Sequence, residues 1–501
     1  MAELPPLPDR VDLLEASKRI HERPGLTEFA RLWLAWAPGA RAETALEAAE
    51  LARPSLSPAS LRAVGRTGAR AARAAVPGLA ADVRHLAAER TLDPVVALRH
   101  VQEVVRAGGP TFVKLGQFIA TAQGLLPAEW VEAFDWCRDT VPAMPDGMVE
   151  QIFFDTFGVP VDAVLDAFDP EPLGAASIGQ VHAARLPDGT DVVVKFRRPG
   201  LREQFATDLR AMALAANAAE RASKTIRAAN LPGFVELFAR MVLEEIDFRF
   251  EAVNQIELAL ASEAAGHDYA AFPQPVPHLV TENVLCMTRV VGVPYDRALE
   301  AYPDVVDGER LLRLAITSVL EHTIAYGVFH GDLHAGNVLI SPDGDFGLID
   351  FGIAGRLDAN QRAAAVEYLF GFAANDTRQQ IRGLRRFGAV PDDIDVDALA
   401  DEVNAALDAL DPALLARTET MSVDQLGQAL GAVVRVLTSH GFRLPTELVL
   451  FFKNLLYLNG FAAALAPDTD LFGQIQPVFG YFMERYPTEL AQIMSGLADE
   501  T

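Results

Sequence analysis

Cationic side chains and cysteines are both scarce in this 501-residue chain. Lys and Arg number 43 against 68 Asp and Glu, which gives a formal net charge of −25. Because nucleic-acid phosphates attract an excess of Lys and Arg, this balance argues against a nucleic-acid binder and against broad electrostatic adhesion to anionic lipid. The two cysteines, Cys137 and Cys286, lie far apart and outside any metal-ligand spacing. We therefore expect no disulfide framework and a reducing compartment.

Targeting and membrane-spanning segments are also missing from the pattern. The N-terminus has no basic stretch followed by an apolar core, so no signal peptide is predicted. The longest apolar segment, Leu448–Ala466, is interrupted by Lys453, Asn454 and Asn459. Because a charge and two amides are costly inside a bilayer, a buried C-terminal helix is favoured over a span. We expect a cytoplasmic protein without a transmembrane span, and peripheral membrane contact stays open.

One ordered pair of motifs carries recognisable chemistry. Residues 329–337 read Phe-His-Gly-Asp-Leu-His-Ala-Gly-Asn, and Leu-Ile-Asp-Phe-Gly follows at 348–352. In kinase-type sites an Asp such as Asp332 orients the attacking hydroxyl or water. An Asn and a second Asp, here Asn337 and Asp350, hold Mg²⁺ against the nucleotide phosphates. The spacing therefore predicts the metal and phosphate end of an ATP site.

The two histidines of this stretch have more modest predicted roles. His330 is expected to be a buried structural residue that is hydrogen-bonded within the loop. His334, between Asp332 and Asn337, is expected to shape the loop, and direct catalysis by it is the less favoured alternative.

The order of predicted elements agrees with a two-lobed kinase plan. Stretches with helical periodicity and stretches with strand periodicity follow one another along the chain. The predicted segments are a helical N-terminal region of unknown role (1–100), a helical extension (101–163), a small β-rich N-lobe with inserted helices (164–295), and a helical C-lobe with C-terminal helices (296–501). We predict an α+β, protein-kinase-like fold with an N-terminal helical extension, in which nucleotide binds between the lobes.

A candidate phosphate-contacting lysine ends a β-branched run. Lys195 follows Val192-Val193-Val194 after a hairpin, which is the position of the strand lysine that contacts the α- and β-phosphates in kinases. The loop expected over the phosphates contains Gly174, Ala175, Ala176 and Ser177. Methyl groups in this loop should narrow the approach of backbone to phosphate compared with glycines.

A kinase-type lysine needs a carboxylate partner, and Glu251 is the candidate. Steps of seven and four residues place Glu244 and Asp247 on the same helix face as Glu251, while Glu245 lies roughly a third of a turn away. A solvated acidic face is the alternative interpretation.

Taken together, these residues resemble the UbiB/AarF family of atypical protein-kinase-like proteins from about residue 100 to about residue 475. Lys114-Leu-Gly-Gln117 resembles the KxGQ signature of that family, and Glu245-Ile-Asp247 resembles its ExD motif. The loop at 174–177 resembles its alanine-rich loop, although Gly174 stands where the family usually has the first of three alanines.

The resemblance implies further roles. Lys114 and Gln117 would belong to a regulatory helical extension over the active site, with Lys114 paired to Glu245 or Asp247. The segment Met287-Thr288-Arg289 would be the hinge that faces adenine. No Ala-Pro-Glu segment follows Asp350, so no platform for a peptide substrate is expected.

The function expected from these features is that of an ATP- and Mg²⁺-dependent atypical kinase or ATPase. Its acceptor would be water or a small or lipid-like molecule. The resemblance implies a link to isoprenoid-quinone or other lipid metabolism, with pathway intermediates and their enzymes as partners. A nucleotide-binding scaffold with negligible turnover is the alternative. An antibiotic or choline phosphotransferase, supported only by the loop at 330–337, is disfavoured by Lys114-Leu-Gly-Gln117.

Overall fold

The computed structural model forms two compact units, and each is assembled from separate stretches of the chain. It describes residues 6–55, 109–120, 142–222, 231–410, 445–467 and 471–488, with scattered positions in 58–66, 102–106, 133–138 and 432–442, and Thr469. The sheet unit comprises 38–249 and 278–288, and the loop unit comprises 1–37, 250–277 and 289–501. The predicted domain boundaries stay predictions, and the end of the predicted N-terminal region lies outside the described residues.

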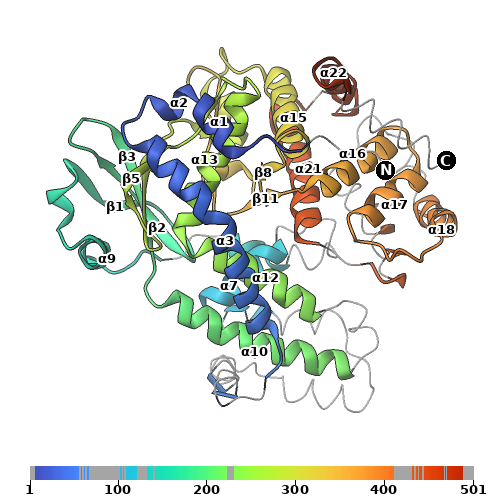
Figure 1. Ribbon diagram of the computed structural model, residues 1–501, viewed down its shortest axis with the longest axis horizontal. Coiled ribbons are helices and arrows are strands. Elements are labelled where there is room, and N and C mark those ends of the chain that lie inside the picture. The colour runs from blue at the N-terminus through green and yellow to red at the C-terminus, as the bar shows by residue number, and fades with distance from the viewer. Residues whose placement is uncertain are drawn as a thin grey trace. The chain divides into compact units, whose positions relative to one another are not determined.

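The sheet unit contains a five-stranded sheet in the order β1-β2-β3-β6-β5 (Figure 1). Its strands are β1 (Ala167–Ala175), β2 (Gly179–Arg185), β3 (Asp191–Arg197), β5 (Pro275–Val280) and β6 (Val284–Thr288). Strand β5 begins in the stretch assigned to the loop unit and enters the sheet unit at residue 278. Buried and partly exposed residues alternate along β3, as expected for a strand with one face on the core. The hairpin predicted before Lys195 is confirmed: its turn lies at Asp188-Gly189, where Gly189 has a φ of 84° between β2 and β3.

The other elements of the sheet unit, among its described residues, are helices. They are α7 (Pro110–Ala120), η1 (Asp135–Arg138), α9 (Met148–Phe157), η2 (Val161–Ala163), α10 (Leu201–Ala222) and α12 (Leu231–Glu245). A small core joins α7 to η1 through Phe112, Ile119, Phe134 and Cys137. Two long helices, α3 (Leu26–Ala52) and α13 (Phe248–Ala264), continue from one unit into the other.

The loop unit is mostly helical, with short strands around its central loop. Its strands are β4 (Ala270–Ala271), β7 (Val293–Pro294), β8 (Val328–His330), β9 (Val338–Ile340), β10 (Phe346–Leu348) and β11 (Ala354–Arg356). Four of them form a sheet in the order β4-β10-β9-β7, and β11 pairs with β8. The β8–β11 pair holds the two motif segments side by side, with Ala354 opposite His330.

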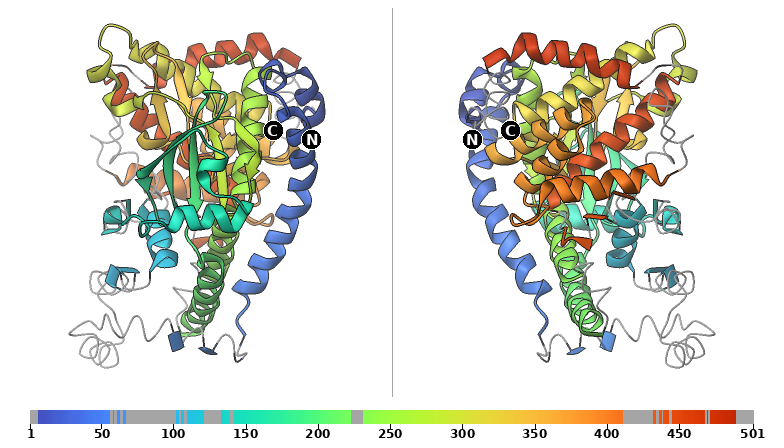
Figure 2. Two further views of the ribbon diagram at one scale, coloured as in Figure 1. Left: turned by 90° about the vertical axis from the view of Figure 1, so that its left-hand side faces the viewer. Right: turned by 90° about the vertical axis from the view of Figure 1, so that its right-hand side faces the viewer.

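The helices of the loop unit begin with α1 and end with α22. They are α1 (Arg10–Ala16), α2 (Lys18–His21), η3 (Tyr295–Arg297), α14 (Ala298–Ala301), α15 (Gly308–Ile324), η4 (Ala335–Asn337), α16 (Ala359–Ala373), α17 (Thr377–Arg386), α18 (Val396–Asp408), α21 (Thr446–Leu465) and α22 (Leu471–Arg485). The right-hand view of Figure 2 shows the orange helices α16 and α17 packed side by side, and α15 also contacts α21.

The apolar C-terminal helix α21 lies in the core of the loop unit. Among the described residues, Glu447–Leu465 is the one helix long and apolar enough to cross a membrane, and 61% of its most apolar stretch is buried within the protein. Leu458, Phe461 and Leu465 belong to one core cluster with residues of α15, β9, β10 and α16. This packing supports the prediction of a buried helix.

A buried carboxylate fastens α22 to the loop unit. Glu321 of α15 is fully buried and accepts hydrogen bonds from His267 Nε2 and Tyr481 Oη, both at 2.8 Å, and from Tyr486. Arg485 Nε lies 2.9 Å from its Oε1. Burial alone would raise the pKa of Glu321, but these hydrogen bonds hold the pKa below its usual range.

Removing this carboxylate should loosen α22. We expect Glu321→Ala to lower the free energy of unfolding by about 2–4 kcal/mol, because several buried donors lose their acceptor. Because the pKa of Glu321 is lowered in the native protein, ionised Glu321 stabilises the native state at pH values above the usual pKa of glutamate. This contribution is lost progressively as the pH falls from the usual pKa through the lowered one. Urea unfolding at pH 7 and pH 4 should therefore show a smaller mutational effect at pH 4. An equal effect at both values would contradict this role.

Candidate functional site

The loop between β8 and β9 is organised by a buried histidine. His330 is 3% exposed, its Nδ1 accepts from Asp332 N at 3.1 Å, and its Nε2 lies 3.2 Å from Ile349 O. Burial lowers the pKa of His330, so the neutral imidazole that can accept and donate in this way is favoured. The predicted structural role of His330 is confirmed.

Backbone and side-chain hydrogen bonds bring Asp332, Asn337 and Asp350 to one place. Asn337 Nδ2 donates to Asp332 O at 2.9 Å, and Ile349 N donates to Asn337 O at 3.0 Å. Ile349 directly precedes Asp350, so the second motif is fixed against the first. The structure therefore confirms that these segments meet.

Asp350 has an unusual backbone. Its φ is 57°, in the left-handed region, where a non-glycine residue costs roughly 1–2 kcal/mol. Its carboxylate is exposed, and Oδ1 accepts from Gly352 N at 3.4 Å. Such strain occurs where the position of a side chain matters to function.

The two motif segments offer oxygen ligands of the kind that Mg²⁺ takes. Mg²⁺ is usually held by one or two carboxylates together with substrate phosphates. Asp350 supplies a carboxylate, and Asn337, whose amide nitrogen is directed to Asp332 O, offers its carbonyl oxygen.

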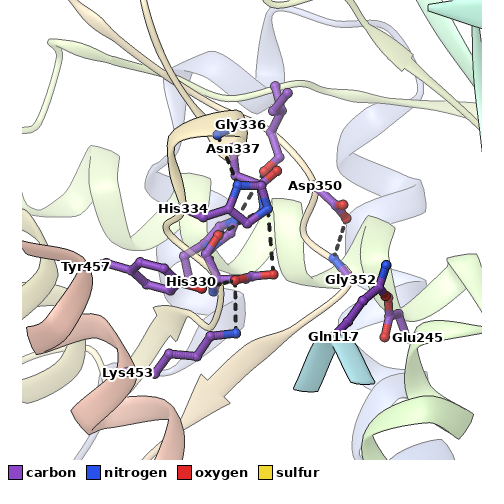
Figure 3. Close-up of polar contacts among 12 residues, drawn as sticks. Gln117, Glu245, His330, His334, Gly336, Asn337, Asp350, Gly352, Lys453 and Tyr457 are labelled. Carbon is purple, nitrogen blue, oxygen red and sulfur yellow. Dashed lines mark hydrogen bonds and ion pairs between the residues drawn. The ribbon is translucent and has the colours of Figure 1, made fainter. Parts of the chain in front are cut away.

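Asp332 is held from a helix far away in the sequence. Its Oδ1 lies 2.9 Å from Lys453 Nζ and accepts from Tyr457 Oη at 2.7 Å, and both residues belong to α21. Figure 3 shows Lys453 and Tyr457 reaching from α21 toward the loop that carries His330. Burial alone would raise the pKa of Asp332, but Lys453, His334 and the Tyr457 hydrogen bond hold the pKa well below its usual range.

Sequence reasoning missed these two residues. Lys453 was treated only as a break in an apolar run. A lysine inside a buried helix requires an anionic partner, and this requirement was the signal that pointed toward a carboxylate.

His334 has a local role. Its Nδ1 accepts from Gly336 N at 3.0 Å, which caps η4, and its Nε2 is 3.9 Å from Asp332 Oδ2. These contacts agree with the prediction that His334 shapes the loop.

Helix α13 is tied to the segment that follows Asp350. Asn254 Nδ2 donates to Phe351 O at 2.7 Å, and Arg356 pairs with Glu257 and donates to Asn254 Oδ1 at 2.5 Å. Glu251 lies one turn before Asn254 and is 2% exposed. The helix that carries the candidate lysine partner is therefore fixed relative to Asp350.

Lys195 lies on β3 of the sheet unit, opposite Val181 and Leu285. Its ammonium is 5.2 Å from the centre of the Phe248 ring, at the first residue of α13. Glu251 follows one turn later on that helix but belongs to the loop unit. The pairing of Lys195 with Glu251 therefore stays a prediction.

One expectation about the acidic stretch is wrong. Glu244, Asp247 and Glu251 do not share one helix face, because α12 ends at Glu245 and α13 begins at Phe248. Asp247 Oδ1 instead accepts from Arg249 N at 3.1 Å at the start of α13. A side chain that caps a new helix competes with continuation of the old one, which periodicity alone does not reveal.

The KxGQ helix, α7, is docked within the sheet unit by two side chains. Lys114 Nζ forms an ion pair with Glu245, as one of the two predicted pairings required. Gln117 Oε1 accepts from Ser177 Oγ at 3.4 Å, and its Nε2 donates to Cys137 O at 3.0 Å. The helix thus contacts both the ExD motif and the alanine-rich loop. The roles of Asp247 and of these residues in regulation stay predictions.

The predicted phosphate loop connects β1 to β2. Ala176 N donates to Gly179 O at 2.8 Å, and Ser177 is 3% exposed. Gly174 and Ala175 end β1. The contacts of these residues with nucleotide stay predictions.

The predicted hinge coincides with a change of unit. The chain passes from the sheet unit to the loop unit between Thr288 and Arg289. Met287 is 6% exposed on β6. The role of Met287 and Arg289 as the hinge that faces adenine stays a prediction.

Comparisons with known proteins show which families and relatives this chain resembles. The ABC1 atypical kinase-like domain matches residues 137–383, and the UbiB helical domain matches residues 419–470. An uncharacterised aarF domain-containing protein kinase of the Arabidopsis thaliana chloroplast is 30% identical over 391 residues, which are 74% of this chain and 72% of that protein. A probable protein kinase UbiB from Pseudomonas entomophila is 31% identical over 76% of this chain and 70% of its own length.

Two further matches come from Mycobacterium tuberculosis. The uncharacterised protein Rv0647c is 33% identical over 75% of both chains. A solved complex of Rv3197 with erythromycin has 18% identity and a TM-score of 0.42, covering 70% of this chain and 90% of that one.

The fold and the loop residues define a protein of the atypical kinase-like class, with a β-sheet N-terminal part and a helical C-terminal part. Within that class, the chain belongs to the UbiB/AarF family.

The two loop glycines should respond oppositely to alanine. A Cβ at Gly179 would lie 2.2 Å from Phe196 O, whereas a Cβ at Gly174 meets nothing within 4 Å. We expect Gly179→Ala to lower the free energy of unfolding by about 1–3 kcal/mol. Gly174→Ala should be neutral or stabilise by up to about 1 kcal/mol. Urea unfolding of both variants checks this, and equal destabilisation would contradict the hairpin geometry.

Loss of the Lys114 ammonium should loosen α7 and, through Gln117, the alanine-rich loop. We expect Lys114→Ala to change the Kd for Mg-ATP by about 3- to 10-fold, in keeping with a partly buried ion pair. Isothermal titration calorimetry measures this, with Lys18→Ala, a change at an exposed lysine of α2, as the matched control. An unaltered Kd would show that α7 does not cover the nucleotide.

Proposed function

We propose that this protein binds Mg-ATP and uses it in a phosphoryl reaction, either hydrolysis or transfer to a small or lipid-like acceptor. The observation that carries the proposal is the hydrogen bond from Ile349 N to Asn337 O, which holds Asp350 beside Asn337 and Asp332. The segments that carry these three side chains, which are suited to one phosphoryl centre, are thereby held together. Phosphoryl transfer needs mainly positioning and charge stabilisation, which such an arrangement provides.

Each residue has a proposed part. Asp350 and Asn337 would hold Mg²⁺, which when bound neutralises charge on the nucleotide phosphates. Asp332 would accept a hydrogen bond from the attacking hydroxyl or water and so orient it. Its lowered pKa makes it a hydrogen-bond acceptor rather than a store for a proton.

Lys195 would contact the α- and β-phosphates, with Glu251 as its partner. Its position on β3 and the burial of Glu251 support this assignment. The loop at Gly174–Ser177 would lie over the phosphates, and the backbone of Met287–Arg289 would face adenine.

The acceptor is proposed from the family and from the α7 contacts. The Lys114–Glu245 pair and the absence of a predicted peptide platform favour water or a small or lipid-like molecule over a protein acceptor. The family resemblance supports a link to isoprenoid-quinone or other lipid metabolism, with peripheral contact to a membrane. That link rests on analogy with relatives rather than on a contact in this chain.

Phosphate release in the presence of Mg²⁺ and phospholipid vesicles tests the proposal. We expect Asp350→Asn and Asp332→Asn each to lower the rate at least about 100-fold, because a ligand or an orienting group is lost. Asp343→Asn, a change at an exposed turn residue of the β9–β10 hairpin, is the matched control and should keep the native rate.

The result also separates the scaffold alternative. Equal rates for the native chain and both site variants would remove the enzyme proposal. Tight Mg-ATP binding without turnover by the native chain would then favour a nucleotide-binding scaffold.

A further inference from the structure

Helix α21 carries a lysine where an apolar residue would be expected. Lys453 is 7% exposed and follows the buried Phe451 and Phe452. An ammonium taken out of water costs several kcal/mol unless a partner compensates it. The partner here is Asp332, whose Oδ1 lies 2.9 Å from Lys453 Nζ. The carboxylate that offsets the desolvation of this ammonium therefore belongs to the candidate catalytic residue.

The two contacts from α21 fall on the same carboxylate oxygen. Lys453 Nζ and Tyr457 Oη both bind Oδ1 of Asp332, at 2.9 and 2.7 Å. At Oδ2, the polar group that the described residues provide is His334 Nε2, whose 3.9 Å exceeds hydrogen-bonding distance. Two donors on one oxygen fix the rotation of the carboxylate, and Oδ2 is left for an incoming donor.

A third contact aligns the helix with the loop backbone. Asn454 Nδ2 donates to His330 O at 2.7 Å, and Asn454 is 1% exposed. His330 also binds Asp332 N through Nδ1. Neighbouring side chains of α21 therefore hold the loop backbone and the Asp332 carboxylate together.

Lysine is a rare residue in this chain. Only Lys18, Lys114, Lys195, Lys224 and Lys453 occur among 43 cationic side chains. A compact ammonium can approach one oxygen of a carboxylate, whereas a planar guanidinium binds both oxygens. At Asp332, an arginine in the bidentate arrangement would occupy Oδ2 as well.

We propose that α21 is part of the catalytic centre, and that Lys453 and Tyr457 hold Oδ1 of Asp332 so that Oδ2 faces the hydroxyl or water acceptor. Lys453 is thus a positioning residue. It also offsets the negative charge of Asp332, which would otherwise repel the phosphates that the acceptor must approach. This inference rests on the proposed function.

Steady-state phosphate release from the full-length chain tests it. We expect Lys453→Met to lower kcat about 30-fold or more, and Tyr457→Phe about 3- to 10-fold, with KM for Mg-ATP within threefold of native. Lys453→Arg should restore little, because its fork competes for Oδ2. Lys18→Met, the same substitution at an exposed lysine, should keep native kcat and KM.

Pairing the two variants separates positioning from mere stability. Since both donors fix one oxygen, the double variant should lose less kcat than the product of the single losses. Losses that multiply, or a KM that rises with kcat unchanged, would overturn the inference. Thermal unfolding and calorimetric Mg-ATP binding show whether each variant is folded. Because Tyr457→Phe keeps the aromatic ring, it tests the inference even where Lys453→Met does not fold.

Variants of the motif aspartates distinguish failure of the proposed function from failure of the proposed role of α21. If Asp332→Asn and Asp350→Asn both keep the native rate, the proposed function fails. If Asp332→Asn loses activity while Lys453→Met and Tyr457→Phe keep the native kcat, the proposed function stands and the role of α21 is wrong.

Discussion

The ion pair between Lys453 and Asp332 connects helix α21 of the core with the loop that carries the proposed phosphoryl-transfer residues. A buried ammonium and a partly buried carboxylate must be matched, since either one alone would be strongly unfavourable. This requirement fixes the register of α21 against the loop, and the Asn454 hydrogen bond to His330 O strengthens it. Helix α21 therefore packs in the hydrophobic core and also contacts the loop that carries Asp332.

The same rule organises other parts of the loop unit. Glu321 collects donors from α22, Glu263 accepts from Ser17 and Lys18 at the start of α2, and Glu257 pairs with Arg356 after Asp350. In an acidic chain, carboxylates that are buried, such as Glu257 and Glu321, or partly buried, such as Glu263, define where a donor must lie. The N-terminal helices, α13, the motif segments and α22 are joined in this way.

Much of the fold could be predicted from local patterns. The β-branched run before Lys195, the turn at Gly189 and the apolar helix at the C-terminus all form as expected. The spacing of the loop motif predicted that its two segments meet, and the β8–β11 strand pair holds these segments together. The break between α12 and α13 was not predicted, since a cap at Asp247 overrides an apparently continuous helical period.

The sequence by itself determined the chemistry of the loop: the identities and spacing of Asp332, Asn337 and Asp350 limit what that segment can bind. Only the tertiary structure decided how Asp332 is oriented. Lys453 and Tyr457 lie more than a hundred residues further along the chain, and their approach depends on how α21 packs against the core. Side-chain partners at such separations follow from packing, which no local pattern encodes.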